Sequence, residues 1–236
     1  MQVLHFDQDY SRLSDFLLPM SPDTNNIIMS YIPGDFRKIW IQLCIWGGVS
    51  FARTKFIKMD LTGIDFRGSN FRGSNFQGSN FQNADLRKVN LLEVNFWEAD
   101  LRGVNLQKSD LRGSDFQDAN LQESNLRRAN LQGINFWGAR IQRANFQDAN
   151  LRGADIQGAY LQNINFQKAD LRDVNFWKAD LRKADLRGAD FQGADLRGAN
   201  FQGANFQDNN FQGSDFQDNN FWGDDLQEFI FWRVDI

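Results

Sequence analysis

The chain has 236 residues, a formal net charge of −4, one cysteine and one histidine. Such a small net charge does not indicate binding to nucleic acid or to an anionic membrane surface. One cysteine excludes an internal disulfide framework, and His5 and Cys44 alone offer little from which to build a nucleophilic or metal site.

Residues 1–48 predict a small, mostly helical N-terminal cap. They contain all three prolines of the chain, and proline is excluded from stacked backbone ladders because it lacks an amide donor. Residues 9–18 and 35–46 place apolar side chains at helical spacing, the second stretch through Phe36, Ile39, Trp40 and Leu43.

The N-terminus has no basic segment leading into an apolar one, and the longest apolar stretch, 39–49, is far shorter than a membrane span. We therefore expect a cytoplasmic protein without a membrane segment. In this setting Cys44 is expected to be a small buried apolar residue, and His5 an ordinary N-terminal residue.

From Phe51 to Ile236 every fifth residue is Phe, Leu or Ile, over 38 consecutive positions. We call this position the centre. A period of five matches neither a helix nor a strand, so the chain must turn at a fixed interval, which predicts a solenoid.

The other positions of the repeat have their own preferences. Small residues lie two before the centre and are expected to point inward beside it. Asp or Asn precedes 33 of the 38 centres, as expected for acceptors of nearby backbone amides. All 16 glycines beyond residue 50 lie two after a centre, which predicts a positive φ in a type II turn. The Gln, Arg and Lys side chains are expected to be solvated.

This pattern resembles the pentapeptide-repeat family, as in Ala184-Asp185-Leu186-Arg187-Gly188. The resemblance covers residues 49–236. It implies an all-β solenoid, a right-handed quadrilateral parallel β-helix with 20 residues per coil and nine to ten coils. It implies little about function: many members have no known activity, and a subset bind DNA gyrase.

Departures from the repeat are the candidates for function. Trp97, Trp137 and Trp177 are 40 residues apart and would lie on one face at every second coil. The sequence favours an ancestral duplication of 40 residues, and the alternative is an aromatic strip that binds a partner.

Within the array, the Asp/Asn position is replaced in mid-run at Arg140 and Tyr160, 20 residues apart. We expect them to be stacked neighbours, around a corner from Trp137. Either the guanidinium stacks on the phenol as a local compensation, or the three side chains form a recognition patch.

A line of arginines is also expected on one outward face, at Arg72, Arg112, Arg152 and Arg172. Acidic residues nearby favour a mixed, solvated surface over a phosphate track. At the C-terminal end, the bulky Phe229, Phe231, Trp232 and Ile236 either seal the last coil or form a homodimer contact, and the sequence weakly favours the dimer.

Three classes of function follow. The favoured one is a non-enzymatic scaffold or protein-binding rod with an unidentified protein partner. A DNA mimic that binds a topoisomerase fits the rod and the acidic end, but residues 1–200 are nearly neutral. An enzyme is disfavoured because no nucleophile–base pair is evident and no Gly-Lys-Ser/Thr accompanies the glycines. No catalytic residue, cofactor or metal is expected.

Overall fold

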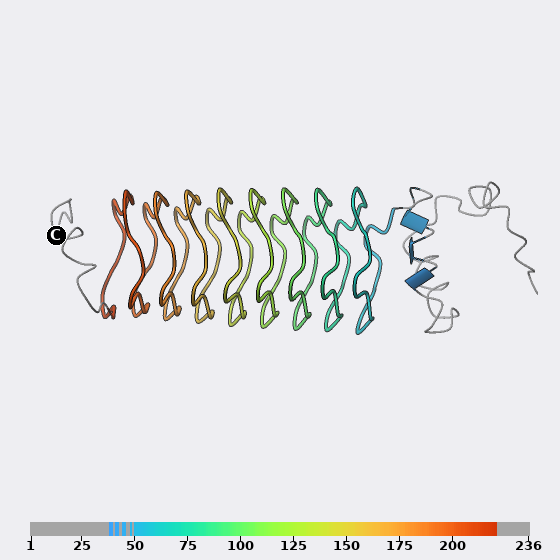
Figure 1. Cartoon of the computed structure of the whole chain (residues 1–236), viewed down its shortest axis with the longest axis horizontal. Helices are drawn as coiled ribbons and strands as arrows, with labels where there is room; N and C mark the ends of the chain where they lie inside the picture. The colour runs from blue at the N-terminus through green and yellow to red at the C-terminus, as the bar shows by residue number, and fades with distance from the viewer. Residues whose placement is uncertain (1–37, 40, 43, 46–47, 49, 221–236) are drawn as a thin grey trace, which may run out of the picture.

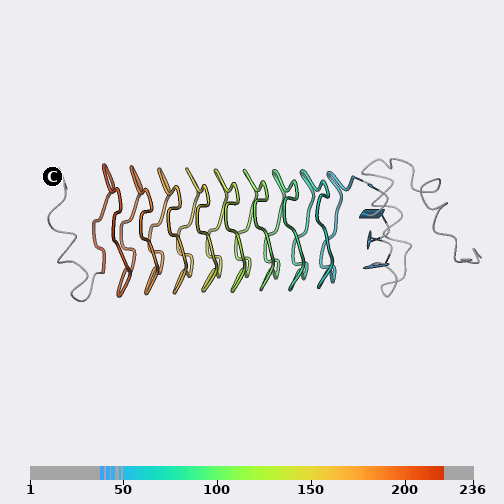
Figure 2. The same ribbon diagram turned by 45° about the horizontal axis from the view of Figure 1, so that its top comes forward.

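The computed structural model describes residues 38–39, 41–42, 44–45, 48 and 50–220. Residues 50–220 form a stack of coils, seen side-on in Figures 1 and 2. Parallel bridges join residues 20 apart, from Lys55 with Asn75 to Asn200 with Asn220. A turn follows every centre, so each coil has four sides, and each side contributes a single bridge residue rather than a longer strand.

Backbone hydrogen bonds hold each coil to its neighbours. In the repeat that begins at Phe76, the amides of Phe76 and Gly78 donate to carbonyls of the next coil, and the amide of Asn80 donates to the preceding coil. The amide of Ser79 closes the turn by donating to the Phe76 carbonyl. Four of the five amides in each repeat are thus bonded to backbone, and the fifth needs another acceptor.

The Asp or Asn side chain supplies that acceptor. In the same repeat, the Asn75 Oδ1 accepts the Gln77 amide at 2.9 Å, across the centre residue. The same bond recurs along the array, including Asp65 with the Arg67 amide at 3.1 Å and Asn145 with the Gln147 amide at 3.0 Å. The predicted role of this position is confirmed, because the side chain completes the hydrogen bonding of each corner.

The centres fill the interior. Every centre from Phe51 to Phe201 has at most 1% of its surface exposed, and the small residues two before them are mostly buried as well. Five centres on one side, Phe56, Phe76, Phe96, Phe116 and Phe136, form a column with ring centroids 4.6–5.3 Å apart. Such offset ring contacts add to the stability given by burial alone.

The predicted turn conformation is confirmed at the glycines, which have φ between 64° and 75° in the array. Nineteen non-glycine residues at the same position also have a positive φ, among them Lys88 and Asp118. Glycine therefore relieves backbone strain at this position but is not required there.

A helical segment covers the first coil, with helical residues at 38–39, 41–42 and 44–45. Ile41 and Cys44 are fully buried, which confirms the prediction for Cys44, and burial raises the pKa of its thiol to about 12. The predicted apolar face was wrong at Ile39, which is 57% exposed. The helix rotates toward the coil because Lys38 pairs with Asp60 at 2.8 Å and Gln42 donates to the Asp65 carbonyl.

The remaining predictions for the cap, including the helix at 9–18, lie outside the described residues. So do the C-terminal residues Phe229, Phe231, Trp232 and Ile236, so the seal and the dimer contact stay predictions.

Candidate partner-binding site

The Asp/Asn acceptor is missing at a few corners of the array. Within residues 50–220, the corner amides of Ile57, Gln142 and Gln162 have no side-chain acceptor. The residues two before them are Lys55, Arg140 and Tyr160. Two of the three gaps are thus the mid-array replacements that the sequence singles out, and the structure gives them a cost of one hydrogen bond each.

Arg140 and Tyr160 are stacked neighbours, joined by a parallel bridge, as predicted. Together with Trp137 they line a hollow of about 450 Å³ at a corner of the stack. We call it the corner hollow; its full lining is Asp118, Asn120, Trp137, Gly138, Arg140, Gly158 and Tyr160. The structure therefore brings the three predicted side chains to one site.

The rings at this site are open to solvent. Trp137 is 44% exposed and Tyr160 is 48% exposed, although both are large apolar side chains. The stacking of Arg140 on Tyr160 is not observed, since the cation–π contact among the described residues joins Lys178 to Trp177 at 4.0 Å. The compensation that the sequence favoured is thus absent.

Arg140 differs from most other arginines of the array. Of the 15 arginines among the described residues, 13 lie within 4.0 Å of a carboxylate, and Arg53 and Arg140 do not. The guanidinium of Arg140 is exposed and makes no ion pair with any described residue. It is therefore a free five-donor group beside two exposed rings.

The usual arrangement is an arginine folded back on the aspartate two residues before it. In the Asp110 corner, the Nε and Nη2 atoms of Arg112 donate to the two carboxylate oxygens at 2.8 and 2.7 Å. These hydrogen bonds lower the pKa of Asp110 and raise the pKa of Arg112. The sequence signal was Asp-x-Arg, which was read only as solvated side chains and therefore missed.

These pairs also settle the predicted arginine line. Arg72 lies 3.7 Å from Glu93, Arg152 lies 3.2 Å from Asp173, and Arg112 and Arg172 pair with aspartates at 2.7 and 2.6 Å. The mixed surface is confirmed, because each cation already has a counter-charge.

The tryptophan series belongs to a longer strip. Ile57, Trp97, Trp137 and Trp177 lie in one register, each two coils from the next. Ile57, Trp97 and Trp137 are 44%, 36% and 44% exposed, and Trp177 is half-buried under Lys178. We call these four residues the apolar edge. Ile57 was missed because only the repeated Asn-Phe-Trp drew notice.

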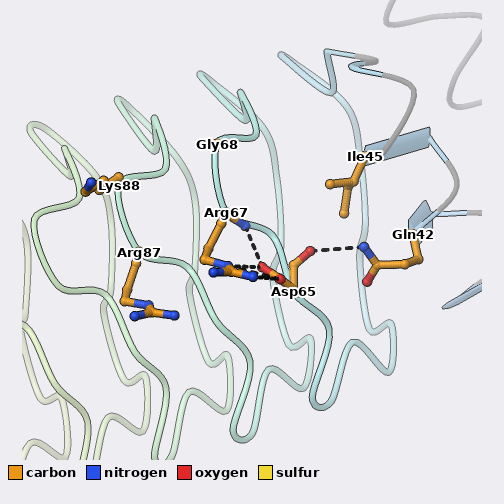
Figure 3. Close-up of a pocket in the computed structure, with 7 residues that line it drawn as sticks. All are labelled: Gln42, Ile45, Asp65, Arg67, Gly68, Arg87 and Lys88. Atoms are coloured by element: carbon orange, nitrogen blue, oxygen red, sulfur yellow. Dashed lines mark hydrogen bonds and ion pairs between the residues drawn. The ribbon is translucent and has the colours of Figure 1, made fainter.

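A second hollow, of about 600 Å³, lies where the helical segment meets the stack (Figure 3). Arg67 closes its floor by donating to both carboxylate oxygens of Asp65, and the Gln42 amide donates to the Asp65 carbonyl at 3.3 Å. Figure 3 shows Ile45 as its apolar wall, with Lys88 and Arg87 on the following coil. Its central cation is paired, which makes it a joint between segments rather than an open site.

Comparison with protein families now decides the kinship. The pentapeptide repeat region model matches residues 39–126 and 89–166, and the pentapeptide repeats model matches residues 149–188 and 184–223. The chain belongs to the pentapeptide-repeat family. No curated protein sequence gives a match to it.

Solved structures of the family resemble this chain. QnrB1, a plasmid-mediated fluoroquinolone resistance protein, is 20% identical with a TM-score of 0.50, over 78% of this chain and 92% of its own. HetL, involved in heterocyst differentiation regulation in the cyanobacterium Nostoc, is 24% identical with a TM-score of 0.45, over 72% and 88%. At these identities the likeness concerns the fold alone.

Two further searches of the described residues bear on function. No helix among them has the length and apolarity needed to cross a lipid bilayer. No group of three or more His, Cys, Asp or Glu side chains among them is arranged to hold a metal ion.

Proposed function

We propose that this pentapeptide-repeat protein is a non-enzymatic, protein-binding rod whose docking site is the corner hollow. The observation that carries the proposal is the coincidence of two features at Arg140 and Tyr160. Both positions give up the hydrogen bond that completes the corner, and both line the hollow beside Trp137. Positions that break a local rule at a cost in stability are expected at functional sites.

The hollow has the chemistry of a protein-binding hot spot. Trp, Tyr and Arg are the residues most enriched in such spots. The two rings offer apolar surface, and the free guanidinium of Arg140 can donate to a carboxylate or carbonyl of the partner. The acidic side chain in the lining, Asp118, already accepts a hydrogen bond from the Gln117 amide group at 3.2 Å.

We also propose the finer features of the fold. Residues 49–236 would form a right-handed quadrilateral β-helix of nine to ten coils, and residues 1–48 its mostly helical cap. The 20-residue bridge register and the family membership support the first. The burial of Ile41 and Cys44 against the stack supports the second.

The test is capture of partners from native lysate by the immobilised wild-type protein and by the double variant Arg140→Asn/Tyr160→Asn. This variant restores the corner acceptors, so it should be at least as stable as wild type while losing the guanidinium and phenol. We expect a partner that wild type enriches to fall at least tenfold with the variant, measured by quantitative mass spectrometry.

The matched control is Gln147→Ala/Asn150→Ala, on the opposite corner of the same coils. It removes an existing acceptor for the Arg152 amide, so it disturbs the fold more than the test variant does. Partners retained equally by wild type and by the asparagine variant would contradict the proposal.

A DNA mimic that binds a topoisomerase is the alternative. The general likeness to QnrB1 supports its shape. However, a mimic needs free carboxylates, and many aspartates of the array are neutralised, as Asp180 is by Arg182 at 2.6 Å. A supercoiling assay that shows no inhibition of gyrase and no protection from quinolones would exclude it.

A further inference from the structure

The apolar edge has a spacing that selects one kind of ligand. Its residues repeat every two coils, and adjacent bridged chains lie ~4.8 Å apart, so successive side chains are ~9.6 Å apart. A polyproline II segment repeats the same side every three residues, or ~9.3 Å. Over the three intervals from Ile57 to Trp177, the difference accumulates to only ~1 Å.

Other peptide conformations fit this edge less well. A β-strand presents the same side every ~6.8 Å, which matches neither one nor two coils. An α-helix repeats its side after seven residues, or ~10.5 Å, and drifts by ~3 Å over the same three intervals. The spacing thus favours polyproline II.

The polar groups of this edge complement the same ligand. None of the indole N–H groups of Trp97, Trp137 and Trp177 donates a hydrogen bond to a described residue. The Arg140 guanidinium and the Tyr160 hydroxyl are also without partners among the described residues. A polyproline II backbone has no internal hydrogen bonds, so its carbonyls are free to accept from such donors.

Charge indicates a further property of the ligand. Glu98 and Asp118 are stacked one coil apart, beside Trp97 and at the corner hollow. Both are exposed, and neither forms an ion pair with a described residue. Two neighbouring unpaired carboxylates repel each other, and a cation from a partner would relieve that repulsion.

We propose that the apolar edge binds a proline-rich segment in the polyproline II conformation, with a basic residue placed over Glu98 and Asp118. Prolines would enter the gaps between successive Trp side chains, where Gln117 and Gln157 form the floor. This inference rests on the proposed function, because it names the partner class of that protein-binding rod. Aromatic surfaces are the usual receptors of such segments.

The probe is a fluorescein-labelled proline-rich peptide about ten residues long, with one arginine, a length that covers the edge at ~3.1 Å per residue. Binding is followed by fluorescence anisotropy with the full-length protein. We expect saturable binding, at least tenfold weaker for a peptide in which glycines replace the prolines. We also expect a severalfold loss with Glu98→Gln/Asp118→Asn.

The decisive control exchanges two residues of the edge. Gln117→Trp/Trp137→Gln keeps the composition and the number of Trp side chains but changes the two-coil spacing. We expect it to bind at least tenfold more weakly than wild type. Equal binding would overturn the spacing argument.

A β-1,4-linked glucan oligosaccharide is tested as a competitor, since exposed tryptophans also stack on sugars. If the glucan binds and the peptide does not, the inference is wrong. If the peptide fails while the asparagine variant still loses its captured partner, the inference fails and the proposed function stands. Loss of neither would contradict both.

Discussion

Two pairs of corners on one side of the stack show what the repeat needs and what it can give up. At Asp100 and Asp180 the carboxylate accepts the corner amide at 3.2 Å and holds the arginine two residues later. At Arg140 and Tyr160, between them on the same side, the amide has no such acceptor, yet the bridges continue unbroken. The stack is therefore stabilised by its interior and ladder, and single corners are free to carry other chemistry.

The largest expected effect tests the shared interior. Phe96→Ala and Phe136→Ala each remove a fully buried ring from the aromatic column. Each should lower the free energy of unfolding by about 3–5 kcal/mol, because a cavity remains where the ring stacked on its neighbours. Chemical denaturation provides the measurement. A loss near zero for Phe136→Ala alone would show that the interior under the corner hollow differs from the rest.

The second effect tests the cost of the exceptional corners. Arg140→Asn and Tyr160→Asn each supply an acceptor for an unbonded amide, and each should raise the free energy of unfolding by about 0.5–1.5 kcal/mol. The control is Asn120→Ala on the same side, which removes an acceptor from the Gln122 amide and should lower stability by a similar amount. If the asparagine variants are less stable than wild type, these side chains stabilise the fold instead.

The smallest effect concerns acid. Hydrogen bonds from Lys38 and Thr62 lower the pKa of Asp60 from 3.8 to about 2. Its folded pKa is therefore the lower one, so its contribution is present above pH ~4 and is lost as pH falls through about 2. Asp60 is largely exposed, so this contribution should stay below about 1 kcal/mol.

Asp60→Asn should therefore be slightly less stable than wild type at about pH 5, with the difference shrinking as pH falls toward 2. Denaturation midpoints at several pH values measure it. A difference that does not change with pH would show that the ion pair with Lys38 does not link the helical segment to the stack. The corner after Arg140 has no carboxylate at that position, so it should not share this acid sensitivity.

Much of the site was predictable because departures from a strict repeat are visible in the letters. The 20-residue coil placed Arg140 beside Tyr160 and both near Trp137 before any coordinate was known. The missing acceptors at Gln142 and Gln162 were not predicted, since they appear only when every amide is assigned a partner. The orientation of Ile39 was also wrong, because helical spacing cannot tell which side meets the first coil.

The sequence by itself determined the solenoid, the inward centres, the corner acceptors and the positive-φ turn, because a period of five leaves the chain few ways to bury its apolar residues. The tertiary structure alone decided which charges are paired. An arginine two residues after an aspartate folds back on it, whereas Arg140 has only Tyr160 and Asn120 stacked above and below it. Pairing depends on the side chains one coil away, at a sequence distance that local patterns do not record.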